Sequence, residues 1–213
     1  MKSRKIFWED SYLQELKSNV IEIKDNYILL DNTIIYSFSG GQVSDKATIN
    51  NQEVISSYID DEGNIWYQTQ NIESFNVGDE VNLRIDWSFR YNIIKLHSAQ
   101  HIVGCIAQEI GLVFSNVRGS NVRESKTTLT YEADSISLEL LQEIEEQSNN
   151  FISQNKEISV SFESENSQKR IWRCGVYEIA CGGLHVKNTQ EIGAIKLKRK
   201  SGGKGREVIE ISL

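Results

Sequence analysis

The first 86 or so residues alternate short apolar runs with turn residues. The runs are rich in β-branched and aromatic residues, and pairs such as DN and NN or the sequence VGDE separate them. Their spacing of roughly 8–12 residues is typical of an all-β domain and predicts a small barrel or sandwich. The expected strands are residues 20–24, 27–30, 33–38, 46–49, 53–59, 64–68 and 80–85.

The pattern changes at Asp86. Asp86 or Ser88 can cap a helix, apolar residues then recur as far as Ile110, and Gly111 suits the end of that helix. A second helix is expected from about Ser137, with one apolar and one acidic face. Strand-like runs occupy residues 127–131, 158–162, 194–198 and 207–213, and the last two flank a Gly-rich hairpin. Residues 88–213 are therefore expected to be α+β, with an antiparallel sheet.

Composition adds a few exclusions. An apolar content of 39% and a charged content of 25% are typical of a globular protein. No stretch is long and apolar enough for a membrane span, and the N-terminus lacks a signal-peptide pattern, so the expected compartment is the cytoplasm. Three cysteines, an odd number, predict core residues or metal ligands and no disulfide framework.

The charge is distributed unevenly along the chain. The formal net charge is −7, and residues 1–89 hold 7 basic and 15 acidic side chains. The segment 196–206, KLKRKSGGKGR, carries six basic residues and no acidic one. Such a stripe can bind phosphates even in an acidic protein, because salt screens distant charge. It can equally be a solvated hairpin whose lysines protect an edge strand.

The sequence HSAQH places His97 and His101 four residues apart on the first expected helix. At this spacing both imidazoles lie on one face and can reach a single ion. The pair by itself is weak evidence, and Ser98 stands where zinc metalloproteases of the HExxH type have glutamate.

A second motif, CGGLH, repeats the spacing with Cys181 and His185. The two glycines between them favour a tight loop, in which both side chains can converge. All three histidines of the chain lie in these two motifs, so a four-coordinate Zn²⁺ site, one per chain, is the preferred interpretation. Cys105 and Cys174 are expected to be core residues.

Taken together, HSAQH, CGGLHVKNTQEIG and the hairpin KRKSGGKGR resemble the editing domain of alanyl-tRNA synthetase and its free-standing relatives, the AlaX proteins. IYSFSGGQVSD resembles the Gly-rich motif of the medium-length AlaX class, which carries a β-barrel before the editing domain. The resemblance covers nearly the whole chain. It implies an N-terminal small β-barrel over residues 1–87 and an α+β zinc-binding editing domain over residues 88–213.

The resemblance also implies an activity, the hydrolysis of mischarged tRNA(Ala), chiefly Ser-tRNA(Ala) and secondarily Gly-tRNA(Ala). His97, His101, Cys181 and His185 match the zinc positions of the family. Ser98 and Gln100 are weak candidates for catalytic groups. The residues expected to contact substrate or tRNA are Gly40, Gly41, Gln42, Lys198, Arg199, Lys200, Lys204 and Arg206. The expected partner is tRNA, with neither a membrane nor DNA involved, and the chain is expected to be a monomer or a homodimer.

Three departures from the family pattern bear on the substrate amino acid. Leu184 stands in place of threonine, Ser39 in place of the first glycine of the Gly-rich motif, and Asn116 is the nearest counterpart of a glutamine. Two other functions remain open at this stage. One is a zinc-containing module that binds RNA without catalysis, and the other is a zinc hydrolase for small esters or peptides.

Overall fold

The computed structural model describes every residue of the chain except 1, 2, 165, 166 and 168. Its internal contacts divide the chain into two compact units. The first comprises Met1–Ser39 and Val43–Tyr91, and the second comprises Gly40–Gln42 and Asn92–Leu213. The three-residue segment Gly40–Gln42 is thus part of the second unit, although the residues on both sides of it belong to the first.

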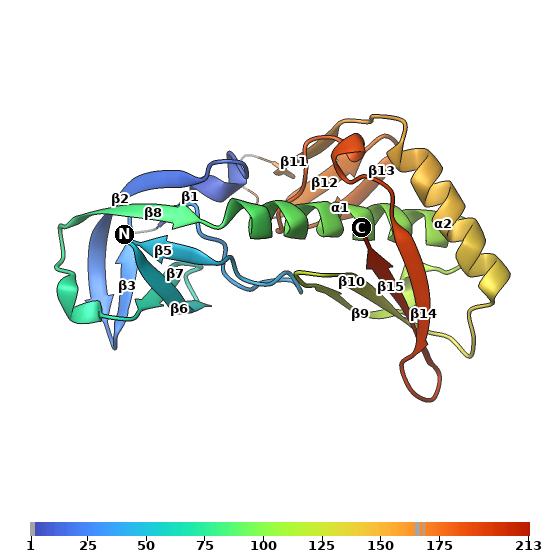
Figure 1. Ribbon diagram of the computed structural model, residues 1–213, viewed down its shortest axis with the longest axis horizontal. Helices are drawn as coiled ribbons and strands as arrows, with labels where there is room; N and C mark the ends of the chain where they lie inside the picture. Colours follow the sequence, from blue (N-terminus) through green and yellow to red (C-terminus); the bar gives the residue numbers. More distant parts are fainter. Residues whose placement is uncertain (1–2, 165–166, 168) are drawn as a thin grey trace. The chain divides into compact units, whose positions relative to one another are not determined.

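Six antiparallel strands of the first unit pair in a ring, and Figure 1 draws them in blue to green. The ring closes because the last strand pairs with the first, Leu83 opposite Leu16. The order is β2 (Glu15–Lys24), β3 (Tyr27–Leu30), β7 (Ile65–Thr69), β6 (Gln52–Ile59), β5 (Ala47–Ile49) and β8 (Glu80–Ile85). The shorter elements of the unit are β1 (Arg4–Lys5), β4 (Asn32–Thr33), η1 (Ile6–Trp8) and η2 (Ile72–Ser74).

One expected strand of this unit is wrong. Of residues 33–38, only Thr33 lies in a strand, although Ile34, Ile35 and Tyr36 are all buried. Side chains bind their backbone groups in place of a neighbouring strand. The Tyr67 hydroxyl donates to the carbonyl of Ile35 at 2.7 Å, and the amide of Tyr36 donates to a carboxylate at 2.6 Å. Apolarity alone could not distinguish this buried connection from a strand.

The second unit contains most of helix α1 (Trp87–Glu109) and all of α2 (Leu138–Ile152). Both match the sequence predictions, and Gly111 after α1 is left-handed as expected. Helix α2 begins close to Ser137 as expected, and the structure shows Ser137 to be its N-cap, whose hydroxyl accepts from the amide of Leu140. Helix α1 is buried on nearly every side over its middle turns, as expected for a helix with apolar residues all round. Neither of these helices combines the length and apolarity needed to cross a membrane.

Two antiparallel sheets flank α1 within this unit (Figure 1). The mixed α+β architecture with antiparallel sheets agrees with the prediction, and the four strands expected in this half are all present. Strands β9, β12 and β13 were not expected. The four-stranded sheet is β14 (Lys196–Ser201), β15 (Arg206–Ser212), β10 (Thr127–Glu132) and β9 (Val117–Val122) in that order, and the three-stranded sheet is β11 (Ile158–Phe162), β12 (Arg170–Cys174) and β13 (Tyr177–Ala180). Two short helices, η3 (Phe114–Asn116) and η4 (Thr189–Glu191), complete the unit.

Within the first unit, a buried ion pair holds the first turn of α1. The guanidinium of Arg90 is fully buried and binds both carboxylate oxygens of Asp45. It also donates to the carbonyls of Ile34 and Ser11. Because a buried charge without a partner is costly, each member of this pair requires the other.

Asp45→Asn should therefore lower the free energy of unfolding by about 3–5 kcal/mol, since it leaves the Arg90 charge buried and uncompensated. Arg4→Ala is the control, because Arg4 and Glu9 form an ion pair that is exposed on both sides. That change should cost less than about 1 kcal/mol. Urea denaturation of the two variants measures both values, and equal losses would contradict the assigned role of the pair.

Candidate metal centre

Helix α1 brings His97 and His101 together on one face. Their rings lie one turn apart, with centroids separated by 4.9 Å. His97 is buried and His101 is partly buried, so the helix aims both imidazoles into the interior of the second unit. The spacing in HSAQH therefore has the consequence expected of a helix.

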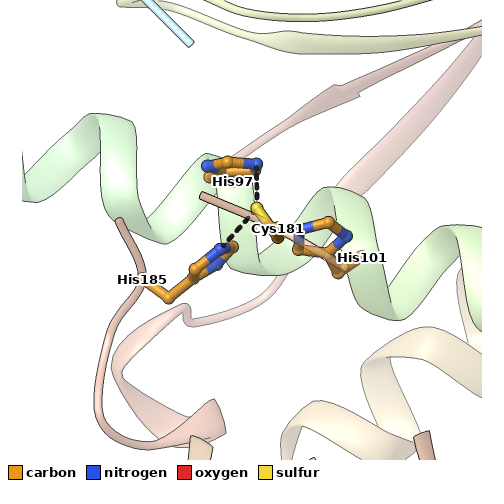
Figure 2. A group of neighbouring side chains, drawn as sticks. All are labelled: His97, His101, Cys181 and His185. Carbon is orange, nitrogen blue, oxygen red and sulfur yellow. Dashed lines mark hydrogen bonds between the residues drawn. The ribbon is translucent and has the colours of Figure 1, made fainter. Parts of the chain in front are cut away.

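The loop that follows β13 adds the other two side chains. Cys181 Sγ lies 3.3 Å from His185 Nε2 and 3.6 Å from His97 Nε2, as the dashed lines of Figure 2 mark. One ligand atom from each of His97, His101, Cys181 and His185 lies within 4.8 Å of every other. The structure thus brings together the four side chains that the sequence singled out, from segments about 80 residues apart.

Glycine is required inside this loop because the backbone passes against a ligand. A Cβ at Gly183 would overlap the imidazole of His97 and lie 2.8 Å from the side-chain oxygen of Gln42. Any larger residue would push the loop away from α1. At Gly183, the absence of a side chain is therefore more important than the backbone flexibility of glycine.

Gln42 orients the imidazole of His97. Its side-chain Oε1 lies 3.0 Å from the amide nitrogen of Leu184 and 2.8 Å from His97 Nδ1. An amide N–H can only donate, so the atom that faces it is the carbonyl oxygen, and the hydrogen of His97 must lie on Nδ1. That tautomer leaves the lone pair on Nε2, the atom that faces Cys181.

Ser98 has the same relation to His185. Its hydroxyl donates to the carbonyl of Ile94 at 2.8 Å and accepts from the amide of Val186 at 3.2 Å. His185 Nδ1 lies 3.3 Å from the same oxygen and therefore acts as the donor there. The lone pair of His185 is thus left on Nε2, which also faces Cys181. Histidines that bind a metal ion usually donate the hydrogen of their other ring nitrogen in this way.

Burial keeps the imidazoles neutral at physiological pH. It lowers the pKa of His97 to about 4 and places those of His101 and His185 well below the usual range. Burial also raises the pKa of the Cys181 thiol, and the amide of Gly183 and the charge of Arg170 oppose that effect. Neutral imidazole is the form that binds a metal ion, so three donors are ready for one.

The donor set fits a tetrahedral metal ion. Nε2 of His101 is buried and has no hydrogen-bond partner among the described residues, a costly state for a polar atom. Zinc distances of about 2.0–2.3 Å place tetrahedral ligand atoms roughly 3.3–3.6 Å apart. The two distances from Cys181 Sγ match this range, and all four ligand atoms lie within 4.8 Å of one another.

The structure places the other predicted residues in different surroundings. Gln100 points to β10, where its amide donates to the hydroxyl of Thr127 and to the carbonyl of Thr128. Cys105 and Cys174 are buried and lie outside the four-residue cluster, as expected of core residues. The predicted basic residues lie on β14, on β15 and in the turn between these strands. They are Lys198, Arg199, Lys200, Lys204 and Arg206.

The Gly-rich segment is joined to the edge of the four-stranded sheet. The amide of Val122 donates to the carbonyl of Gly41 at 2.9 Å, and Gln42 forms a parallel bridge with Val122. Gly41 has a φ of +86°, and a Cβ there would lie 2.5 Å from the carbonyl oxygen of Ser120. Gly40 is also left-handed, at +56°. The two glycines allow the backbone to turn here and so deliver Gln42 to His97.

Two residues near the cluster were missed in the sequence. Arg170 is buried and donates to the carbonyl of Gly183 at 3.3 Å, which supports the ligand loop. Trp172 is fully buried, and its ring centroid lies 5.0 Å from that of His101. The available signal was the run RIWRC, in which Ile171, Trp172 and Cys174 are apolar, as in a buried strand.

Each of the two parts of the chain matches a family model of the synthetases that charge tRNA. Residues 170–209 match the model for the threonyl and alanyl tRNA synthetase second additional domain. Residues 5–89 match the model for class II (A) tRNA synthetases. The first match covers Cys181, His185, β14 and the first part of β15.

Whole-length relatives agree with these matches. The chain is 39% identical to an alanyl-tRNA editing protein AlaX-M of Pyrococcus horikoshii, over 99% of this chain and 98% of the relative. It is 30% identical to an AlaX-M of Saccharolobus solfataricus, with 96% of both chains covered. An alanine–tRNA ligase of Methanococcus aeolicus is 26% identical over 90% of this chain, which corresponds to 23% of the ligase. The full-length similarity, together with the cluster held by α1 and the CGGLH loop, shows that the chain belongs to the AlaX-M family of alanyl-tRNA editing proteins.

Proposed function

We propose that the chain hydrolyses the ester bond of mischarged tRNA(Ala), with serine as the first candidate amino acid and glycine as the second. The observation that carries the proposal is the buried, neutral His97–His101–Cys181–His185 cluster in a chain that is 39% identical, over its whole length, to an alanyl-tRNA editing protein. Zn²⁺ is the proposed ion, because imidazole and thiolate donors in a tetrahedral arrangement favour it. In this site, bound zinc would supply a positive charge that orients or polarises groups of the substrate.

The surrounding residues are proposed to position the ligands. Gln42 and Ser98 fix the tautomers of His97 and His185, and the chemistry assigned to Ser98 is this positioning and not nucleophilic attack. The hydroxyl of Ser98 supports this role, since the carbonyl of Ile94 and the amide of Val186 already engage it. Gln100, held by β10, is proposed to anchor the helix.

Gln42 has a second proposed role in binding substrate. Its side-chain Nε2 is buried and has no hydrogen-bond partner among the described residues, while its oxygen already serves His97 and Leu184. A buried amide donor left over beside a metal cluster can donate to an oxygen of the aminoacyl ester. Within the described residues the cluster contains no Asp or Glu to act as base. We therefore assign help in activating water to the terminal ribose hydroxyl of the substrate.

Discrimination between serine and alanine follows from hydrogen bonding. An apolar pocket excludes an added hydroxyl poorly, so a synthetase cannot easily reject serine on this basis. A site that binds the serine hydroxyl rejects the analogue without it, by roughly 10⁴-fold when the polar groups of the site are left unpaired. An editing site of this kind removes serine and leaves correctly charged tRNA intact.

Purified protein should therefore deacylate Ser-tRNA(Ala) on the order of 10⁴-fold faster than Ala-tRNA(Ala). A panel that includes Gly-tRNA(Ala) and a free seryl ester measures the preference for the hydroxyl and for the nucleic acid. Similar rates on seryl and alanyl tRNA would refute the editing proposal. Rapid cleavage of the free ester would favour a general esterase, and binding of tRNA without any cleavage would favour an RNA-binding module.

Metal content tests the cluster directly. Purified chain should carry one zinc ion, and His101→Ala should lose most of it together with deacylation, since three donors remain. Cys105→Ala is the matched control, because Cys105 lies one helical turn beyond His101 but outside the cluster. Elemental analysis and circular dichroism of the same samples separate loss of metal from loss of fold. Zinc retained at wild-type stoichiometry in His101→Ala would contradict the assignment.

Two substitutions at Gln42 separate its roles. Gln42→Ala should weaken zinc binding by about 10- to 100-fold, because it removes the oxygen that accepts the hydrogen bond from His97 Nδ1. Gln42→Glu keeps oxygen acceptors for His97 and Leu184 but has no amide hydrogen to offer the substrate. It should retain zinc and lose kcat for Ser-tRNA(Ala). Competition with a zinc-binding dye and single-turnover deacylation measure the two effects, and full activity of Gln42→Glu would exclude the donor role.

A further inference from the structure

The four-stranded sheet of the second unit has one apolar face and one polar face. Along β15, Glu207, Ile209 and Ile211 are buried, whereas Val208 and Glu210 alternate with them and are only half-buried. Strand pairing extends the polar face to the neighbouring strands. It consists of Asn121 and Gly119 on β9, Thr128, Thr130 and Glu132 on β10, Arg206, Val208, Glu210 and Ser212 on β15, and Lys196, Lys198 and Lys200 on β14. We call this set the outer face.

Basic side chains surround one of the two carboxylates of the outer face, that of Glu210. Glu210 lies directly across from Lys198 in the strand register. Its Oε2 forms ion pairs with Lys200 at 2.8 Å and with Lys126, which precedes β10. These hydrogen bonds with Lys126 and Lys200 lower the pKa of Glu210 to about 2. The carboxylate therefore holds lysines from both sides of β15 in one place.

Arg199 does not belong to this surface, although it stands between two lysines in the sequence. It pairs with Ile209 in the register and so lies on the apolar face of the sheet. Its guanidinium donates to the carbonyl of Ile136 at 2.7 Å and lies 3.6 Å from Glu207. Arg199 is one of the five basic residues expected to contact tRNA, and its guanidinium is instead bound to groups of the protein.

The positions of the basic residues distinguish between two roles, protection of an edge strand and binding of phosphate groups. Lysines that only protect an edge strand from pairing belong on that strand. Here β14 is an edge, but Lys126 and Arg206 extend the charge to β10 and β15, which are interior strands of the sheet. Between them lie short side chains such as Thr128, Thr130 and Val208. A flat polar surface with a basic border is complementary to a phosphodiester backbone.

We propose that the outer face binds the phosphate backbone of the tRNA substrate, and that Glu210 occupies the place of a phosphate while tRNA is absent. The inference rests on the proposed function for the identity of the nucleic acid. Phosphate groups would take over Lys126 and Lys200 from the carboxylate. Glu210 thus keeps the lysines arranged and also lowers the affinity, because it repels the incoming backbone. Contacts of this kind position a nucleic acid without reading its sequence.

The same sheet connects the outer face to the metal cluster. Its far edge, β9, holds Gly41 through the amide of Val122, and the adjacent Gln42 contacts His97. Four strands about 4.8 Å apart give a width of roughly 14 Å between β14 and β9. Five stacked nucleotides, separated by steps of about 3.4 Å, span that width. One tRNA end can therefore contact the outer face and reach the cluster at the β9 edge.

Substitution of Glu210 gives the sharpest test. Glu210→Gln should tighten the binding of uncharged tRNA by roughly threefold to tenfold at moderate salt, and Lys198→Gln/Lys200→Gln should weaken it by about tenfold or more. The slope of log Kd against log salt should fall by about 0.9 for each lost phosphate contact. Filter binding or fluorescence anisotropy across a salt series measures both.

Matched controls separate this surface from overall charge. Glu80 and Lys17 form an exposed ion pair on the first unit, so Glu80→Gln makes the same change of net charge elsewhere. Arg199→Gln makes the same change as a lysine substitution, but on the opposite face. Both controls should leave the affinity within about twofold of the wild-type value, because a remote charge is screened at moderate salt. Equal tightening by Glu80→Gln and Glu210→Gln would overturn the proposal.

Two further measurements keep the inference distinct from the proposed function. The His101→Ala variant should still bind uncharged tRNA and still show the tightening caused by Glu210→Gln, since the contacts of the outer face do not depend on the metal. Wild-type chain that binds tRNA through these lysines but cleaves no mischarged species would refute the editing function and leave the outer face supported. A change in oligomeric state of Lys198→Gln/Lys200→Gln, without loss of tRNA affinity, would show that the face binds a second copy and overturn the inference.

Discussion

The second unit depends on one constraint, the burial of three imidazoles and a thiol at a single point. Uncharged polar groups in an apolar interior are tolerated only when hydrogen bonds or a metal ion satisfy them. His97 and His185 have their Nδ1 atoms bound to Gln42 and Ser98, which turns both Nε2 atoms towards Cys181. The remaining buried nitrogen, Nε2 of His101, gives the cluster its clearest reason to take up an ion.

This constraint explains features that would otherwise look unrelated. Gly183 lacks a side chain because His97 occupies the space that a Cβ would need. Gly41 lacks one because the backbone at Ser120 passes against it. At both glycines a loop lies close against a neighbouring element. This closeness brings the CGGLH loop to His97 and allows Gln42 to contact the same imidazole. The Gly-rich motif and CGGLH thus serve the same end, although more than 130 residues separate them.

Charge is arranged on a different principle. The metal cluster is buried and its imidazoles are neutral, whereas the outer face is exposed and its lysines are held by Glu210. An exposed ion pair adds little stability, so the triad of Lys126, Glu210 and Lys200 contributes more to the arrangement of charge than to the fold. The net charge of −7 conceals this local order, because all of the excess acid lies in residues 1–89.

The sequence by itself determined the helices, most of the strands and the identity of the four cluster residues. Helix α1 and its histidines follow from apolar periodicity, the spacing of four and the glycine at its end, all of which act within a few turns. Residues 33–38 were wrongly expected to form a strand, because distant partners such as Tyr67 and Asp45 bind their backbone. Strands β9, β12 and β13 were not expected.

Only the tertiary structure decided the roles of the polar residues around the cluster and the direction of each basic residue. Gln42 contacts His97 across 55 positions of sequence, and Ser98 contacts His185 across 87. Arg199 and its neighbour Lys200 have similar charge, but strand register sends them to opposite faces of the sheet. Hydrogen-bond partners and strand register are set by packing between distant segments, and that information does not reside in any short stretch of the chain.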